Sequence, residues 1–85
     1  MIGRIVISKA GRDKGKFMVV LGQSERGYLL SEGKERPISR PKLKNEKHIS
    51  FTNCVLEEKQ FKTNKSLRRA LAEYKAKSGE LQEED

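Results

Sequence analysis

The sequence predicts a mainly β fold, a small barrel of short strands, followed by one amphipathic C-terminal helix. In residues 1–51, short apolar runs alternate with polar turns that contain glycine, a pattern typical of an all-β domain. From residue 64 the apolar residues change to helical spacing. With 85 residues, of which 34% are hydrophobic, the chain is long enough for one domain with a small core.

The first two strands are expected to form a hairpin with a basic tip. Apolar residues at 5–7 and 17–21 flank a polar loop that contains Gly11 and Gly15. Glycine supplies positive φ in turns, or lets another backbone approach closely. Against the one carboxylate of Asp13, this loop carries four cations, which are Lys9, Arg12, Lys14 and Lys16. We therefore expect a cationic surface at the tip, with exposed backbone N–H groups that suit a phosphate.

The apolar pattern predicts three strands in the first 30 residues and indicates how deeply the first two are buried. Ile5 and Ile7 share one face of a half-buried first strand. The second strand, at 17–21, is apolar on both faces, so we expect it in the centre of the sheet. A polar turn at 22–27 then leads to a third strand at 28–30.

Two more strands are expected before residue 52. Gly33 can take the left-handed conformation of a tight turn after the third strand. A fourth strand is predicted at 36–39, and Pro37 restricts it to an edge because proline cannot donate to the ladder. Residues 48–51 alternate again and are expected to close the barrel beside the first strand.

A basic segment at 40–47 joins the fourth strand to the closing strand. Leu43 is its one apolar anchor, and Pro41 predicts a short helical turn, since proline fits the first helical position. If the barrel closes, this segment lies near the Gly11 to Gly15 tip; the alternative is an ordinary solvated loop. Its cations are Arg40, Lys42, Lys44 and Lys47.

The C-terminal third is predicted to be a connector and a helix. Residues 52–63 lose the alternation and are expected to pack on the barrel through Val55, Leu56 and Phe61. A helix is predicted at 64–78, with Asn64 or Ser66 as its cap and Gly79 as its stop. The acidic tail at 79–85 is expected to be disordered. The apolar stripe of the helix is Leu67, Ala70, Leu71 and Tyr74.

Four cations of this helix lie away from the apolar stripe. At 100° per residue they share the opposite side, which is either a second phosphate contact or a solvated face. These residues are Lys65, Arg68, Arg69 and Lys75.

The excess positive charge is confined to the predicted barrel. Residues 1–51 hold 12 basic and 5 acidic residues, a net charge of +7, whereas residues 52–85 hold 7 of each. This division favours a polyanion-binding module with a neutral appendage, the alternative being a soluble domain that happens to be basic.

Catalytic and metal chemistry are poorly supported. Cys54 is the sole cysteine, so no intramolecular disulfide can form, and a reducing, cytoplasmic setting is the default. His48 has no acid and nucleophile pair beside it, and one histidine with one cysteine supplies too few soft ligands for zinc. Asp13 and Glu35 each stand among basic residues and are interpreted as local charge partners. We expect no cofactor, no small-molecule substrate and no membrane segment.

Residues 8–16 resemble the KOW motif of ribosomal proteins and transcription elongation factors. Gly11 and the Asp13-Lys14-Gly15-Lys16 run follow an apolar strand, as in that motif. Phe17 and Met18 stand where KOW motifs often carry a further glycine, and in this the chain resembles the archaeal and eukaryotic large-subunit ribosomal branch. The resemblance implies an SH3-like barrel over residues 1–51 that binds folded RNA through its backbone and groove shape.

The combined expectation is non-enzymatic binding of structured RNA, specifically ribosomal RNA, by a ribosomal or ribosome-associated protein that is monomeric away from the RNA. The alternative is a protein-interaction module of the transcription or translation machinery. The predicted RNA-binding residues lie in the hairpin tip and the later basic segment: Lys9, Gly11, Arg12, Lys14, Gly15, Lys16, Arg36, Arg40, Lys42, Lys44 and Lys47.

Overall fold

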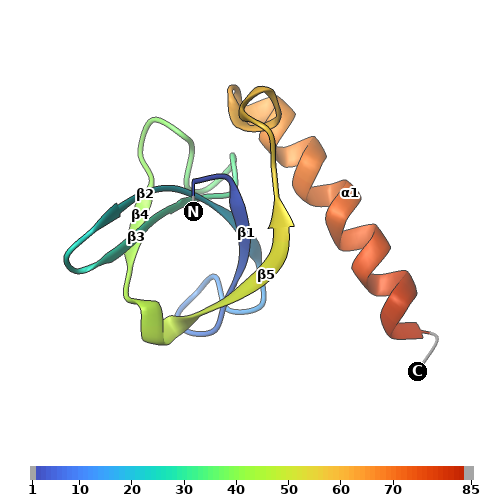
Figure 1. Ribbon diagram of the computed structural model, residues 1–85, viewed down its shortest axis with the longest axis horizontal. Helices are drawn as coiled ribbons and strands as arrows, with labels where there is room; N and C mark the ends of the chain where they lie inside the picture. The colour runs from blue at the N-terminus through green and yellow to red at the C-terminus, as the bar shows by residue number, and fades with distance from the viewer. Residues whose placement is uncertain (1, 84–85) are drawn as a thin grey trace.

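The computed structural model describes residues 2–83 and consists of one five-stranded antiparallel sheet and a long C-terminal helix (Figure 1). Two short 3₁₀ turns, η1 and η2, flank the last strand. In chain order the elements are β1 (Arg4–Ser8), β2 (Phe17–Ser24), β3 (Gly27–Ser31), β4 (Lys42–Lys44), η1 (Glu46–His48), β5 (Ile49–Val55), η2 (Glu58–Phe61) and α1 (Asn64–Glu83).

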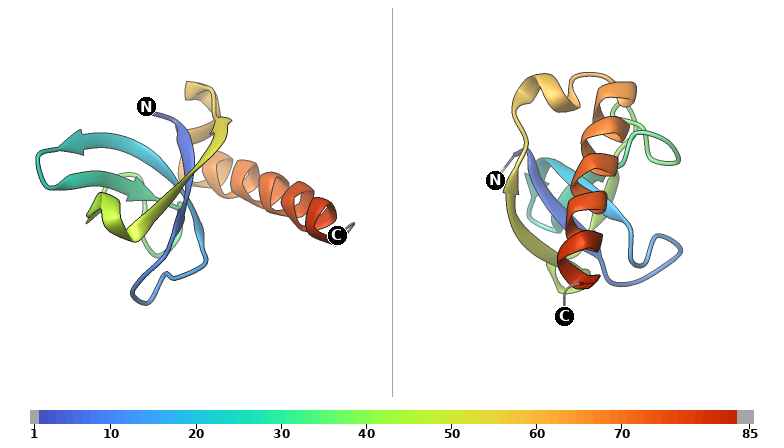
Figure 2. Two further views of the ribbon diagram at one scale, coloured as in Figure 1. Left: turned by 60° about the horizontal axis from the view of Figure 1, so that its bottom comes forward. Right: turned by 90° about the vertical axis from the view of Figure 1, so that its right-hand side faces the viewer.

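The sheet has the strand order β4-β3-β2-β1-β5, which confirms that β2 is central and that the closing strand returns beside the first. Ile5 pairs with Val19 on β2, and Val6 pairs with Phe51 on β5. The sheet is strongly curved (Figures 1 and 2). Because β4 and β5 are its two edges, the sheet is not closed by hydrogen bonds.

The predicted fourth strand at 36–39 and the helical turn at Pro41 are both wrong. Residues after β3 form a compact loop in which Ser31 Oγ donates to the Arg36 carbonyl at 2.6 Å, and Glu32 Oε1 accepts from the Arg36 N–H at 2.6 Å. These bonds engage the backbone N–H and carbonyl of Arg36, which a strand would need for pairing with its neighbour. The strand forms instead at Lys42–Lys44, and the helical turn follows it as η1.

Two other boundaries also differ from the prediction. β2 continues to Ser24, so the turn before β3 is only Glu25 and Arg26, and Gly22 lies at a register shift within the strand rather than in a turn.

β5 continues to Val55, which takes four residues from the predicted connector. Val55 pairs with Arg4 and is 53% exposed, so it is a strand residue and not a buried contact of a connector. Leu56 is buried and Phe61 packs on the core, as expected.

The sheet is buried on both faces, which gives the molecule two apolar clusters. Ile5 and Val6, neighbours on β1, are both fully buried but point into different clusters, so this strand is more buried than its alternation predicted. The inner cluster fills the curved sheet with Val6, Met18, Val20, Tyr28, Leu30 and Ile49. The outer cluster joins the sheet to α1 through Ile5, Val19, Leu56, Leu67, Ala70 and Leu71.

Helix α1 covers the outer cluster with the apolar stripe that its spacing predicted, and Tyr74 packs edge-to-face on Phe17 at 5.3 Å between ring centroids. Thr63 caps it, because its Oγ1 accepts from the Ser66 N–H at 3.0 Å. The Asn64 side chain instead accepts from the Ile38 N–H at 2.8 Å.

The C-terminal half of α1 projects away from the sheet (Figures 1 and 2). The helix does not stop at Gly79, and residues 80–83 of the predicted disordered tail are helical. A glycine inside a helix costs only about 1 kcal/mol relative to alanine, which the rest of the helix can offset. Residues 84 and 85 of that tail lie outside the described part of the chain.

Candidate nucleic-acid interface

The hairpin tip between β1 and β2 is closed by its own backbone. Gly11 and Gly15 have φ of +83° and +86°, the positive values that favour glycine. The Gly15 N–H donates to the Ser8 carbonyl at 2.7 Å, and the Lys14 and Lys16 N–H groups donate to carbonyls of the same loop. Contrary to the expectation, the N–H groups of residues 14–16 are therefore engaged within the hairpin and are not free for a phosphate. What the tip presents to solvent is the exposed side chains of Lys9, Arg12 and Lys14.

A buried ion pair anchors this tip to β4. Lys44 Nζ lies 2.6 Å from Asp13 Oδ1, and it also donates to Ser8 Oγ at 2.8 Å and to the Ala10 carbonyl at 2.7 Å. Its three N–H donors are thus all used. The Lys44 side chain is 6% exposed, so we remove this residue from the predicted contact surface and assign it a structural role.

The Asp13 carboxylate is held ionised by its neighbours. Burial raises its pKa, but the hydrogen bonds from Lys44 and Ser8 and the charges of Lys44 and Lys42 outweigh burial and lower the pKa to about 2. Lys42 Nζ lies 3.7 Å from Asp13 Oδ2. The basic segment at 40–47 therefore does lie against the hairpin tip, and the interpretation of Asp13 as a local charge partner is confirmed.

A second ion pair lies beside the tip. Lys16 Nζ is 2.9 Å from Glu35 Oε1, and this exposed pair lowers the pKa of Glu35 and raises that of Lys16. Glu35 is thus a charge partner too. A cavity of about 190 Å³ separates this pair from Asp13. Its charged lining is Arg12, Asp13, Lys16, Glu32, Glu35, Arg36 and Lys42, with Met18 at the apolar side.

Of the remaining predicted cations, three lie between β3 and β5 and four lie on α1. Arg36, Arg40 and Lys47 are exposed. On α1, Arg68 donates from its guanidinium to the Gly33 carbonyl at 2.7 Å, which ties the helix to the loop after β3. The other three helix cations are exposed, but Lys65 and Lys75 are ten positions apart and extend along the helix rather than forming one cluster.

Lys34 is a cation of this region that the sequence pattern did not single out. It is exposed on the loop after β3, and it lines a groove with Arg68 and Lys75 of α1. Only the folding of that loop against the helix reveals this proximity. The one indication in the sequence was that Lys34 follows Gly33, a glycine suited to a tight turn. In the structure Gly33 has a φ of +85°.

Other kinds of site have no counterpart in the described residues. Within 2–83, no group of three or more His, Cys, Asp or Glu side chains is arranged to hold a metal ion. In the same range, no helix combines the length and the apolar composition needed to cross a bilayer. Cys54 is half-buried and packs against the outer cluster.

In comparisons with known proteins, no protein-family model and no curated protein matches this chain.

Proposed function

We propose that this protein is a non-enzymatic RNA-binding protein of the KOW type, with an SH3-like barrel, that recognises structured RNA such as ribosomal RNA as a ribosomal or ribosome-associated protein of the cytoplasm. The observation that carries the proposal is the charge arrangement at the hairpin tip. Asp13 is buried against Lys44, whereas Lys9, Arg12 and Lys14 are exposed. The surface left to a partner at this tip is therefore cationic, as phosphate binding requires.

The curvature of the sheet supports the proposed barrel. β5 lies next to β1, and the inner cluster occupies the concave side of the sheet, as a barrel interior would. The two edge strands of the sheet, β4 and β5, are consecutive in the chain and are joined through η1 (Figure 1).

The aromatic residues support recognition by backbone and shape rather than by a row of stacked bases. Phe17 packs on Tyr74, Tyr28 packs on Phe51, and Phe61 contacts the outer cluster. These five rings are engaged in the two cores, so the sheet does not offer an aromatic platform of the RRM kind. Phosphate contacts by Lys and Arg then supply most of the affinity.

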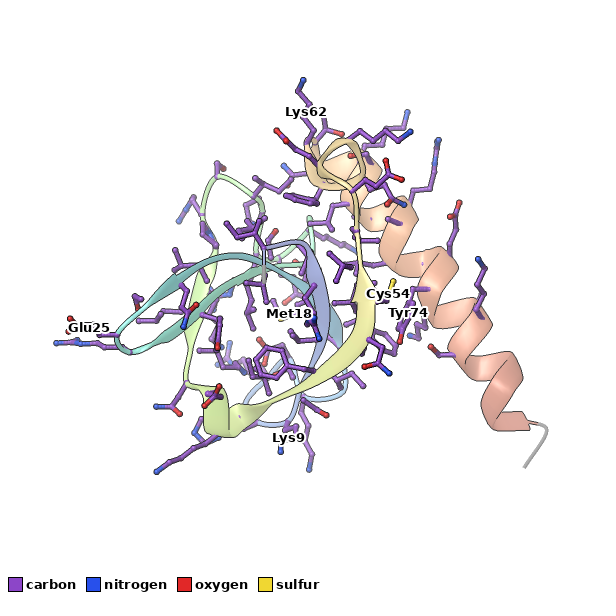
Figure 3. All side chains as sticks on the ribbon, viewed as in Figure 1. Lys9, Met18, Glu25, Cys54, Lys62 and Tyr74 are labelled. Carbon is purple, nitrogen blue, oxygen red and sulfur yellow. The ribbon has the colours of Figure 1, made fainter. Side chains whose placement is uncertain are left out.

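The test compares two pairs of exposed cations at opposite ends of the molecule. Lys9 marks the hairpin tip, and Lys62 projects from the far end (Figure 3). The double variant Arg12→Ala/Lys14→Ala is expected to weaken binding to a structured RNA by roughly tenfold or more, since each lost phosphate contact contributes. The control Lys59→Ala/Lys62→Ala removes the same charge from η2 and the residue after it.

Both double variants should unfold at nearly the wild-type temperature, because exposed charges contribute little to stability. Equal losses of affinity in the two variants would show that only net charge matters and would remove the tip from the proposed site. If the wild type binds no RNA and instead retains a protein partner, the alternative of a protein-interaction module replaces the proposal.

A further inference from the structure

A second feature, a groove between the sheet and α1, combines an apolar floor with a cationic rim. Its volume is about 290 Å³. Phe17, Leu71 and Ala72 provide the floor. The charged residues around it are Lys16, Lys34, Arg68 and Lys75, with Glu32 as the one acid.

The charges of this rim are not equally available. Glu32 Oε1 accepts from the backbone N–H groups of Lys34 at 3.0 Å and Arg36 at 2.6 Å, so its carboxylate is engaged in the loop. Among the described residues, the Lys34 and Lys75 ammonium groups form no ion pair, and both side chains are exposed. The groove therefore presents two cations without an ion-pair partner in the described part of the chain, one from the loop and one from the helix.

The two walls of the groove are fixed to each other. Arg68 on α1 donates to the Gly33 carbonyl at 2.7 Å. A Cβ atom added at Gly33 would lie 2.8 Å from the Asn64 carbonyl oxygen, so glycine permits this close approach of loop and helix. Such a groove exists before a ligand binds, which lowers the cost of ordering on association.

The groove is continuous with the proposed RNA surface. Lys16 lines both this groove and the cavity beside the hairpin tip that Arg12 also lines. The cavity beside the tip and the groove therefore share Lys16, whose ammonium also pairs with Glu35 at 2.9 Å. The volume of about 290 Å³ lies near the lower end of the range for small-ligand sites, so it suits one small ligand.

We propose that this groove binds one unpaired nucleotide of the RNA, with the base on the apolar floor and its phosphate between Lys34 and Lys75. A base has an apolar face and the adjoining phosphate is anionic, so one nucleotide complements both parts of the groove. The inference rests on the proposed function and deepens it. The RNA recognised would be a duplex with a flanking single-stranded nucleotide, and α1 would be part of the binding surface.

The test uses a blunt RNA duplex and the same duplex with an overhang of unpaired uridines. The wild type should bind the overhang duplex roughly tenfold more tightly than the blunt one, the advantage expected from stacking one base. Lys75→Glu should abolish this advantage. The matched control Lys77→Glu makes the same charge change at another exposed position of α1, about 200° around the helix from Lys75, and should retain it.

Lys34→Glu, on the opposite wall, should reproduce the loss independently of the helix. An advantage retained by both Lys75→Glu and Lys34→Glu, or absent from the wild type, would overturn the inference while leaving duplex binding intact. Failure of the wild type to bind either RNA would instead refute the proposed function, and the inference with it. Binding of a glutamate-rich amphipathic peptide that Lys75→Glu abolishes, with no overhang advantage, would make the groove a protein-docking site and overturn the inference as well.

Discussion

The buried Asp13 side chain attaches the basic hairpin tip to β4. Its carboxylate receives hydrogen bonds from Ser8 at 2.7 Å and Lys44 at 2.6 Å. Removing one partner of a buried ion pair is costly, because the remaining charge is left without compensation in a medium of low dielectric constant. The tip can therefore expose three cations on a short loop while its base stays attached to β4.

The pKa of Asp13 predicts an acid-sensitive contribution to stability. The group titrates at about 2 in the folded protein and near 3.8 when unperturbed, so its contribution is fully present above about pH 4 and is lost as the pH falls toward 2. A shift of this size corresponds to about 2 kcal/mol. Thermal unfolding between pH 7 and pH 2 should show the wild type losing its advantage over Asp13→Asn across this window.

At neutral pH, Asp13→Asn should be less stable than the wild type by about 3 kcal/mol, since the buried Lys44 loses its carboxylate partner. The control is Glu35→Gln, which breaks the exposed pair with Lys16 and should change stability by less than about 1 kcal/mol. A neutral-pH stability of Asp13→Asn equal to that of the wild type would show that the Lys44 ammonium does not depend on this carboxylate.

At the scale of elements, periodicity predicted the parts of the fold that bury many apolar residues. β1, β2, β3 and β5 and the apolar stripe of α1 were found where alternation or helical spacing placed them. β4 was missed because its Lys-Leu-Lys sequence has little apolar content, and its Leu43 side chain is 43% exposed. It is a strand because it pairs with β3, a tertiary effect that local propensity does not contain.

The position of the candidate site could be predicted from the sequence. Which of its cations are exposed, and which is buried in an ion pair, could not. The loop glycines and cations marked the tip, and the return of β5 beside β1 brought the basic segment to it. Which cation is buried could not be predicted, because Lys44 and Asp13 are 31 residues apart and meet only in the folded sheet. The groove on α1 was missed for the same reason, since Lys34 and Lys75 belong to separate elements.

The outer cluster predicts that the stability of the sheet depends on its contact with α1. Leu67 is fully buried between the helix and the sheet. Leu67→Ala should lower the free energy of unfolding by about 3 kcal/mol, through lost burial and the cavity that remains. Arg69→Ala, at an exposed position of the same helix, should change it by less than about 0.5 kcal/mol. Urea denaturation measures both, and equal stability of Leu67→Ala and wild type would mean that the sheet folds without this contact.

At the scale of the whole molecule, the net positive charge lies in the part of the chain that forms most of the sheet, and the part that contains the helix has no net charge. The net +7 of residues 1–51 lies on the strands and their loops, and the electrically balanced residues 52–85 contain the end of β5, η2 and α1. The helix thus adds apolar burial to the sheet without adding net charge. If the proposed RNA binding holds, long-range attraction to the polyanion would come from the sheet and its loops, and α1 would act only through the local cations of its groove wall.

The salt dependence of RNA binding tests this division. If about four to six cations contact phosphates, log K should fall with log[salt] at a slope of roughly −3 to −5, because each contact releases about 0.7 to 0.9 of a counterion. Arg12→Ala/Lys14→Ala should reduce the steepness by roughly 1.5, whereas Lys59→Ala/Lys62→Ala should leave it unchanged. Affinity measured across a salt series for the three proteins gives the slopes. An identical slope in all three would mean that the hairpin tip contacts no phosphate, and a wild-type slope near zero would favour a protein partner over RNA.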